Sequence, residues 1–154
     1  SNAFFKFGSI RMICRLIDER FPDYENVIPS QNPIKMTISR TDLLGSLKRI
    51  AIYANKTTHQ VRLKITGSEL QVSAEDLDFS NEANERLSCE HEGEDIEIGF
   101  NAKFLIEMLS NLDTDQIKLN MSAPNKAGVI LPAEKDKEED ILMLVMPVML
   151  NQYV

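Results

Sequence analysis

The chain has 154 residues, 43% of them hydrophobic, and a formal net charge of -7, which suits an ordinary globular protein of one domain or one domain and part of another. The acidic balance argues against strong nucleic-acid binding through net charge, although it leaves room for a local basic face. No apolar run reaches the roughly 18 to 20 residues of a membrane-spanning helix, and no signal-peptide pattern is present, so we expect a cytoplasmic protein with no membrane partner.

The first segment predicts strands rather than a targeting signal. Residues 1–3, "SNA", have the sequence of a remnant of a cleaved expression tag, and "FFKFGSIRMICRLI" after them is typical of strands. Because no initiator Met precedes this segment, we expect the chain to begin inside a larger protein.

Two later stretches, about sixty residues apart, resemble each other. "IKMTISRTDLLGSLKRIAIYAN" begins at Ile34, and "DIEIGFNAKFLIEMLSNL" begins at Asp95. Each opens with alternating apolar residues, which is the period of a half-buried strand. Each then meets a small polar residue, Thr41 or Asn101, that can cap a helix. Each stretch therefore predicts a strand followed by a helix.

Helical spacing after each cap separates an apolar face from a polar face. The apolar faces consist of Leu43, Leu44, Leu47, Ile50, Ala51 and Ala54 in the first helix and of Phe104, Leu105, Met108, Leu109 and Leu112 in the second. The opposite faces carry Lys48, Arg49 and Lys56 in the first helix and Lys103, Glu107 and Ser110 in the second. Either polar face could be a solvated surface only, so these cations alone do not establish a binding site.

Three strand-like segments follow each helix. They are "HQVRLKI", "ELQVSA" and "FSNEANERLSCE" after the first helix, and "QIKLNMS", "AGVILP" and "ILMLVM" after the second. The charged cluster Glu134–Asp140 is then the solvated tip of a hairpin, and "ILMLVM" is its return strand. The predicted fold is α+β, with two βαβββ repeats between Ile34 and Leu150 and two helices on one face of an antiparallel sheet.

The sequence offers no clustered ligands for a metal or a redox site. Cys14 and Cys89 lie far apart, and His59 and His91 are isolated, whereas such sites need closely spaced ligands. We expect reduced structural thiols, surface histidines, no metal and no cofactor.

The acidic pairs do not form a catalytic constellation either. Asp18–Glu19, Glu75–Asp76 and the cluster Glu134–Asp140 have no His or Cys partner at a meaningful spacing, and we interpret them as solvated surface. No Gly-rich phosphate loop occurs. The chain is therefore expected to be a binding protein and not an enzyme.

Four segments spread over nearly the whole chain carry a more specific signal. They are "RFPDYENVIP" from Arg20, "ANKTTHQVRL" from Ala54, "EIGFNAKFL" from Glu97 and the C-terminal "VMPVML". In their order and spacing, and with the duplicated βαβββ layout, they resemble the bacterial DNA sliding clamps, the beta subunit of DNA polymerase III.

This resemblance implies a domain organisation and a function. Residues 4–33 would be the end of the second clamp domain and the linker, and residues 34–154 the third domain. Members of the family form a head-to-tail dimeric ring around duplex DNA. As non-catalytic processivity factors, they tether replicative and repair polymerases and the clamp loader.

The resemblance also assigns a hydrophobic cleft that receives short linear peptides. The matching positions are Pro22, Asn26 and Val27 on the linker, Pro124 in a turn, and Leu144, Met146, Pro147, Val148, Met149 and Leu150 at the C-terminus. Methionine side chains adapt to different ligands, and Pro147 should end the strand and free the residues after it to line a groove. Family members often carry a basic residue where Asn26 stands, so that contact should be weaker here. Residues 141–145 alone could be a core strand.

Two further surfaces follow from the same resemblance. The DNA-facing candidates are Lys48, Arg49, Lys56 and Lys103, which should give weak, sequence-independent contact. The ring-interface candidates are Ile52, Tyr53, Glu82 and Glu85, beside a polar edge strand that a partner's edge could extend. A generic peptide-binding adaptor domain is the alternative function, and a purely structural domain comes third.

Overall fold

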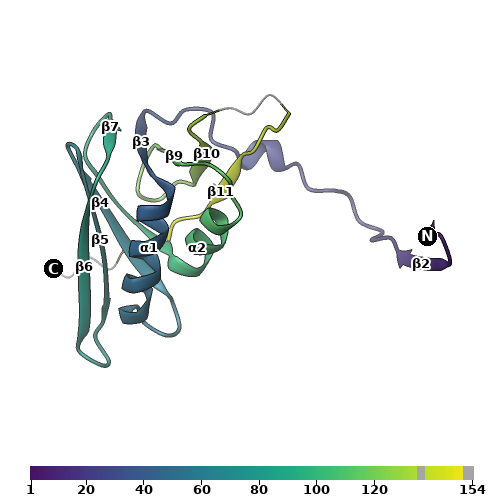
Figure 1. The fold of residues 1–154 in the computed structure, drawn as a ribbon, viewed down its shortest axis with the longest axis horizontal. Helices are drawn as coiled ribbons and strands as arrows, with labels where there is room; N and C mark the ends of the chain where they lie inside the picture. Colours follow the sequence, from purple (N-terminus) through teal and green to yellow (C-terminus); the bar gives the residue numbers. More distant parts are fainter. Residues whose placement is uncertain (135–137, 151–154) are drawn as a thin grey trace.

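The body of the molecule consists of two helices and two antiparallel sheets (Figure 1), in a computed structural model that describes residues 1–134 and 138–150. The first repeat contains β3 (Ile34–Ser39), α1 (Arg40–Ile50), β4 (Gln60–Thr66), β5 (Glu69–Asp76) and β6 (Asn81–Ser88). The second contains β8 (Ile96–Asn101), α2 (Ala102–Ser110), β9 (Gln116–Met121), β10 (Gly128–Pro132) and β11 (Met143–Val145). A short strand, β7 (Glu90–Glu92), lies between the repeats. The predicted α+β class and the duplicated βαβββ order are confirmed.

The two repeats exchange their first strands. One sheet has the order β11-β10-β9-β3-β7 and the other the order β6-β5-β4-β8. The first strand of the first repeat, β3, pairs with β9 over six residue pairs, and β8 of the second repeat pairs with β4 over six. The strands are thus divided between two sheets, each built from both repeats, and α1 and α2 contact each other.

The predicted N-cap residue is confirmed for α2 but not for α1. Asn101 is the N-cap of α2, as predicted, and its side-chain oxygen accepts a hydrogen bond from the Lys103 backbone N–H at 2.9 Å. The N-cap of α1 is Ser39, whose hydroxyl accepts from the Asp42 backbone N–H at 3.3 Å. The prediction of Thr41 was wrong because the helix begins one residue before it, at Arg40.

The core lies between the sheets and the helices and follows the predicted periodicities. Its largest fully buried side chains include Phe100, Met36, Leu47, Ile98, Leu105 and Leu119. One helix residue contradicts its predicted place, because the Phe104 ring in the first turn of α2 is 56% exposed. Phe104 lies beside the short edge strand β11, which leaves the ring largely uncovered.

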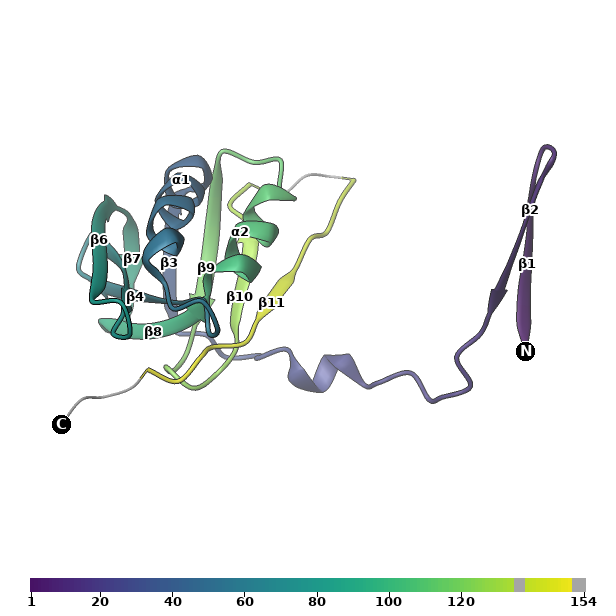
Figure 2. The ribbon, with the colours of Figure 1, turned by 90° about the horizontal axis from the view of Figure 1, so that it is seen from below.

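The N-terminal part stands away from the body (Figure 2). Strands β1 (Asn2–Phe7) and β2 (Ile10–Arg15) form a two-stranded hairpin, so that Asn2 and Ala3 belong to a strand. A linker with a short 3-10 helix, Tyr24–Val27, joins the hairpin to β3. Among the described residues, neither α1, with 11 residues, nor α2, with 9, has the length and apolar content to cross a bilayer.

The return strand of the last hairpin is shorter than predicted. It spans Met143–Val145 instead of residues 141–146, and Leu142 and Met146 on either side are exposed. The predicted charged tip, Glu134–Asp140, lies partly outside the described residues, at positions 135–137. Its described members Glu134, Glu138, Glu139 and Asp140 are exposed.

Candidate functional site

The C-terminal segment after β11 lies on the surface and is not sealed inside the core. Pairing with β10 ends at Val145, two residues before Pro147, which has no N–H to donate to a ladder. Met146 and Met149 are 64% and 70% exposed, whereas Pro147, Val148 and Leu150 are half-buried. The segment therefore presents flexible thioether side chains to solvent.

This segment crosses from one sheet to the other. The Val148 N–H donates a hydrogen bond to the Gly99 carbonyl in β8 at 2.8 Å, which forms an isolated antiparallel bridge. Since β11 is the edge of one sheet and β8 the edge of the other, residues 146–150, the C-terminal tail, join the two sheet edges.

An apolar depression lies between α2 and β11. It has a volume of about 360 Å³ and is lined by Phe104, Glu107, Met108, Asn111, Met143 and Leu144. Leu144 is half-buried and lies opposite Val129 of β10 in the strand register. We call this depression the α2–β11 groove. Of the predicted cleft residues, Leu144 alone lines it.

The linker candidates are not brought into that groove. Pro22, Asn26 and Val27 are exposed, with Val27 in the short 3-10 helix that lies near β11 in both ribbon views (Figures 1 and 2). The Asn26 amide donates a hydrogen bond to the Asp23 carboxylate at 2.7 Å. Pro124 is exposed in the turn between β9 and β10 and does not line the groove.

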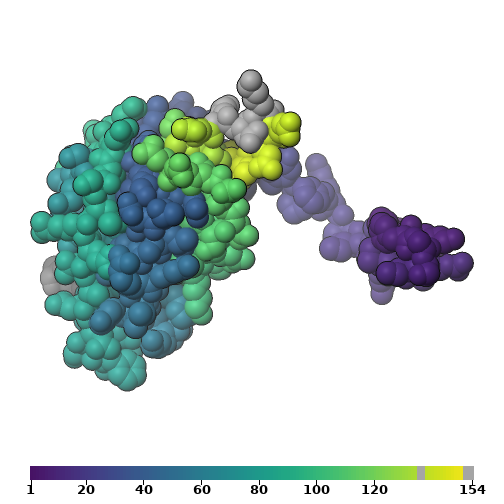
Figure 3. All heavy atoms as spheres, in the orientation of Figure 1, coloured from purple at the N-terminus to yellow at the C-terminus, as the bar shows by residue number. Residues whose placement is uncertain are grey.

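The two helices lie side by side on one face of the molecule, with α1 in blue and α2 in green (Figure 3). Of the four cations predicted on this face, Arg49 is engaged by a carboxylate. Its Nε and Nη2 donate to the two carboxylate oxygens of Glu85, both at 2.7 Å. Lys48, Lys56 and Lys103 are exposed and form no ion pair within the part of the chain that the structure describes.

The Arg49–Glu85 pair links α1 to the edge strand β6 and joins a predicted DNA contact to a predicted ring contact. Hydrogen bonding to Arg49 lowers the pKa of Glu85, with a smaller opposing effect of burial, and the same bond raises the pKa of Arg49. Glu85 is therefore ionised at neutral pH and already paired with Arg49, whereas Glu82 on the same strand is exposed.

An exposed apolar patch adjoins this edge strand. Ile52 and Tyr53, on the turn after α1, are 67% and 42% exposed, and Leu77 and Phe79, between β5 and β6, are 62% and 69% exposed. The Asn55 amide nitrogen lies 3.4 Å from Asp76 Oδ1 and 3.5 Å from Asp78 Oδ2, which holds the two turns together. The sequence pattern did not single out Leu77.

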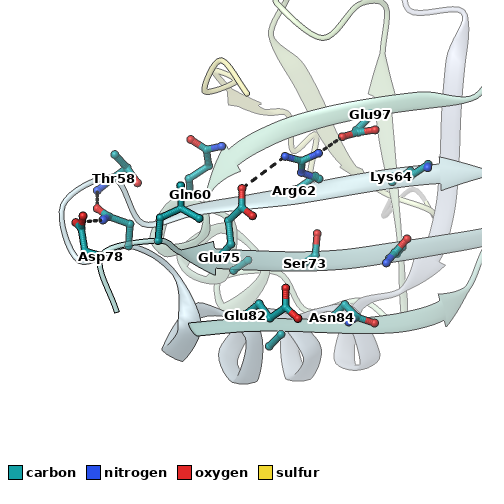
Figure 4. A pocket seen from close by; sticks show the side chains of 15 residues that line it. Thr58, Gln60, Arg62, Lys64, Ser73, Glu75, Asp78, Glu82, Asn84 and Glu97 are labelled. Carbon is teal, nitrogen blue, oxygen red and sulfur yellow. Dashed lines mark hydrogen bonds and ion pairs between the residues drawn. The ribbon is translucent and has the colours of Figure 1, made fainter. Parts of the chain in front are cut away.

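A polar depression of about 600 Å³ occupies the outer face of the β6-β5-β4-β8 sheet (Figure 4). Its charges largely compensate each other, because Arg62 pairs with Glu97 and lies 3.9 Å from Glu75. Asp76, the last residue of β5, is only 3% exposed and does not line this depression, so the prediction of solvated surface was wrong there. Asp76 accepts from the Asp78 backbone N–H and from Asn55, which makes it part of a turn.

Nothing in residues 1–134 and 138–150 groups three or more possible metal ligands, and Cys14 and Cys89 are free thiols. Burial raises the pKa of the Cys89 thiol, which disfavours a reactive thiolate. The apolar α2–β11 groove and the paired charges on the outer sheet face are features suited to binding.

Comparison with known proteins gives a consistent assignment. The family model described as "DNA polymerase III beta subunit, C-terminal domain" matches residues 25–148. The beta sliding clamp of Pseudomonas putida is 32% identical over 136 residues, which is 88% of this chain and 37% of that protein. The beta sliding clamp homolog GriR of Streptomyces muensis is 33% identical over 144 residues, covering 92% of this chain and 38% of GriR.

Solved structures agree in fold. A DNA polymerase sliding clamp from Pseudomonas aeruginosa superposes with a TM-score of 0.89 at 29% identity, over 97% of this chain and 40% of that one. A sliding clamp from the same species bound to griselimycin gives 0.84 at 30% identity, over 91% and 37%. The chain thus spans less than half the length of these relatives.

Proposed function

The chain belongs to the DNA polymerase III beta subunit family, the bacterial sliding clamps, and matches its C-terminal domain, and we propose that it serves as the C-terminal part of a sliding clamp. In this proposal a dimeric ring encircles duplex DNA in the cytoplasm and carries no catalytic activity. Residues 34–154 form the third domain, and residues 4–33 supply the end of the second domain and the linker. Family membership favours this function over a generic adaptor.

The peptide-docking role is supported above all by the exposure of the C-terminal tail. Met146 and Met149 face solvent, and Leu144, two residues before Met146, lines a groove together with Phe104 and Met108. Apolar side chains left uncovered beyond the end of a half-buried edge strand mark an interaction surface. Crystal structures of relatives from Pseudomonas aeruginosa and Bartonella birtlesii contain bound griselimycin, which provides a probe for this chain.

Binding should be of moderate strength. A peptide that buries about 300 Å² of apolar surface gains roughly 7 kcal/mol before the costs of association and ordering. These costs amount to several kcal/mol and bring the expected Kd to about the micromolar range. Such affinity suits polymerases and a clamp loader that must exchange on one clamp.

Contact with DNA should be weak in this chain. The pairing of Arg49 with Glu85 leaves Lys48, Lys56 and Lys103 as the proposed contacts on the helix face. So few phosphate contacts give low affinity and no sequence preference, which is compatible with sliding. We expect no measurable duplex binding at physiological salt, and a tight, sequence-specific gel shift would contradict the proposed DNA role.

The proposed ring interface combines the edge of β6 with the apolar patch Ile52, Tyr53, Leu77 and Phe79. An edge strand offers unpaired backbone groups, and exposed apolar side chains supply burial energy. Glu82 is the exposed carboxylate available to a basic partner, since Glu85 already binds Arg49.

Calorimetry tests the docking role directly. Griselimycin and a synthetic peptide from a bacterial replicative polymerase should each bind the wild-type chain, and Met146→Glu should weaken both at least tenfold, because a carboxylate is then placed in an apolar contact. Met12→Glu is the matched control, since Met12 is an exposed methionine on the distant β1–β2 hairpin. Equal affinities of wild type and Met146→Glu would overturn the proposed docking surface.

A further inference from the structure

Gly99 lies where the C-terminal tail touches β8. In the ladder between β4 and β8 it stands opposite Arg62, on the outer face of the sheet, yet it is buried. Its neighbours Ile98 and Phe100 point into the core. The covering on the outer side comes from the tail, through the Val148 bridge.

A side chain at position 99 would collide with that tail. A β-carbon built on Gly99 would stand 2.5 Å from the Val148 carbonyl oxygen and 2.8 Å from Leu150 Cδ2. Ordinary contacts between such atoms are about 3.5 Å, so the tail backbone would have to move by roughly an ångström. The rotation of one flexible side chain cannot relieve this, since the nearer atom belongs to the backbone.

The backbone conformation of Gly99 does not itself require glycine. Its φ is not among the positive values, which in glycines occur at Gly8, Gly67 and Gly93. The missing β-carbon therefore serves the close approach of the tail and not a turn.

We propose that Gly99 is a positioning residue for the peptide-docking surface, because its bare backbone seats Val148 and Leu150 and thereby fixes how Met146 and Met149 are presented. This inference rests on the proposed docking function. Leu144 in β11 lines the groove just before the tail begins, and the tail is anchored by the hydrogen bond from Val148 to Gly99. An exposed methionine, Met146 or Met149, lies on each side of that anchor. Losing the anchor would leave the two methionines without a defined position.

The test is Gly99→Ala, measured by hydrogen exchange and by calorimetry with griselimycin. The Val148 amide should be protected in the wild type and exchange at least tenfold faster in the variant, while amides of β9 remain protected. Griselimycin should bind roughly 3- to 10-fold more weakly, as expected for the loss of one net hydrogen bond and its ordering effect. Gly45→Ala is the matched control, because Gly45 lies within α1, away from the tail.

A second pair of variants changes the same contact on the tail side, at Val148, and tests the proposal even if Gly99→Ala does not fold. Val148→Pro removes the N–H that Gly99 accepts, whereas Val148→Ala keeps it. The proline variant should lose clearly more griselimycin affinity than the alanine variant.

The outcomes separate the two claims. A wild-type chain that binds neither griselimycin nor a polymerase peptide, with its Val148 amide still protected, would overturn the proposed docking function. A wild-type chain that binds, beside a folded Gly99→Ala chain with equal affinity and an equally protected Val148 amide, would overturn the positioning role alone.

Discussion

The two repeats end in edge strands of very different length. In the first repeat β6 pairs with β5 over eight residue pairs, whereas in the second β11 pairs with β10 over three. The Arg49–Glu85 pair fastens α1 to β6, while α2 and β11 are separated by the α2–β11 groove. The same order of elements thus gives two different edges. We call β6, which is joined to its helix by an ion pair, the closed edge, and β11, which is separated from its helix by the groove, the open edge. Pro147, which has no counterpart in β6, stands just beyond the end of the short strand.

Two leucine substitutions, one in β5 beside the closed edge and one in the open edge strand β11, should differ in their effects on stability. Leu70 in β5 is fully buried, so Leu70→Ala should lower the free energy of unfolding by about 3 kcal/mol. Leu144 is half-buried, and Leu144→Ala should cost about 1 kcal/mol. Urea unfolding followed by circular dichroism gives both values.

In griselimycin binding, the order of the two leucine variants should be the reverse of their order in stability. Leu144→Ala should weaken griselimycin binding, and Leu70→Ala should leave it unchanged wherever the chain remains folded. Equal stability losses for the two variants would show that the open edge strand β11 is packed as tightly as β5 beside the closed edge.

Phenylalanine substitutions probe the two edges at similar exposure. Phe104→Ala in the open groove should weaken griselimycin binding about tenfold, since truncating an aromatic anchor commonly costs that much. Phe79→Ala, beside the closed edge, removes a ring of comparable exposure, 69% against 56%, and should leave binding unchanged. Calorimetry measures both, and a loss at Phe79 equal to the loss at Phe104 would place the docking surface elsewhere.

The smallest expected effect concerns the ion pair of the closed edge. Because the pKa of Glu85 is lowered in the folded chain, its contribution is present above the ordinary glutamate pKa and is lost as the pH falls through the lowered value. At pH 7, Glu85→Gln should therefore reduce the urea midpoint by roughly a few tenths of a molar. The difference from wild type should shrink as the pH falls below about 4.3.

Glu69→Gln is the comparison for that pair. The Glu69 carboxylate lies 3.7 Å from Arg86 at an exposed position, so its removal should change the midpoint less at any pH. A pH-independent effect of Glu85→Gln would mean that packing, and not charge, accounts for its contribution.

Local patterns predicted most of the fold, and long-range pairing accounts for what they missed. Apolar alternation located β3 and β8, and helical spacing located α1 and α2, because these signals depend on near neighbours in sequence. The exchange of β3 and β8 between sheets could not be derived this way, since several register choices bury the same residues. The exposure of Phe104 could not be derived from local patterns either, because it depends on how far the neighbouring strand β11 extends.

In the candidate site, too, local features could be predicted from the sequence, whereas long-range contacts could not. Pro147 predicted that the last strand ends close to it, although the pairing stops two residues earlier, at Val145, and the residues after Pro147 were expected to line a groove. The Arg49–Glu85 bond, the burial of Asp76 and the contact of the tail with Gly99 each join residues 21 to 49 positions apart. Single-sequence periodicity contains no information about such contacts, although a glycine inside a strand is a signal of close backbone approach.

The exchanged first strands also determine how the body would respond to force. The ladders β3–β9 and β4–β8 each hold six residue pairs and each connect one repeat to the other. Separating the two repeats would require the hydrogen bonds of both ladders to break together, because each ladder keeps the repeats in place while the other is intact. Within a ring of the proposed kind, such a body would act as a stiff link, and bending during opening would fall on the joints between domains.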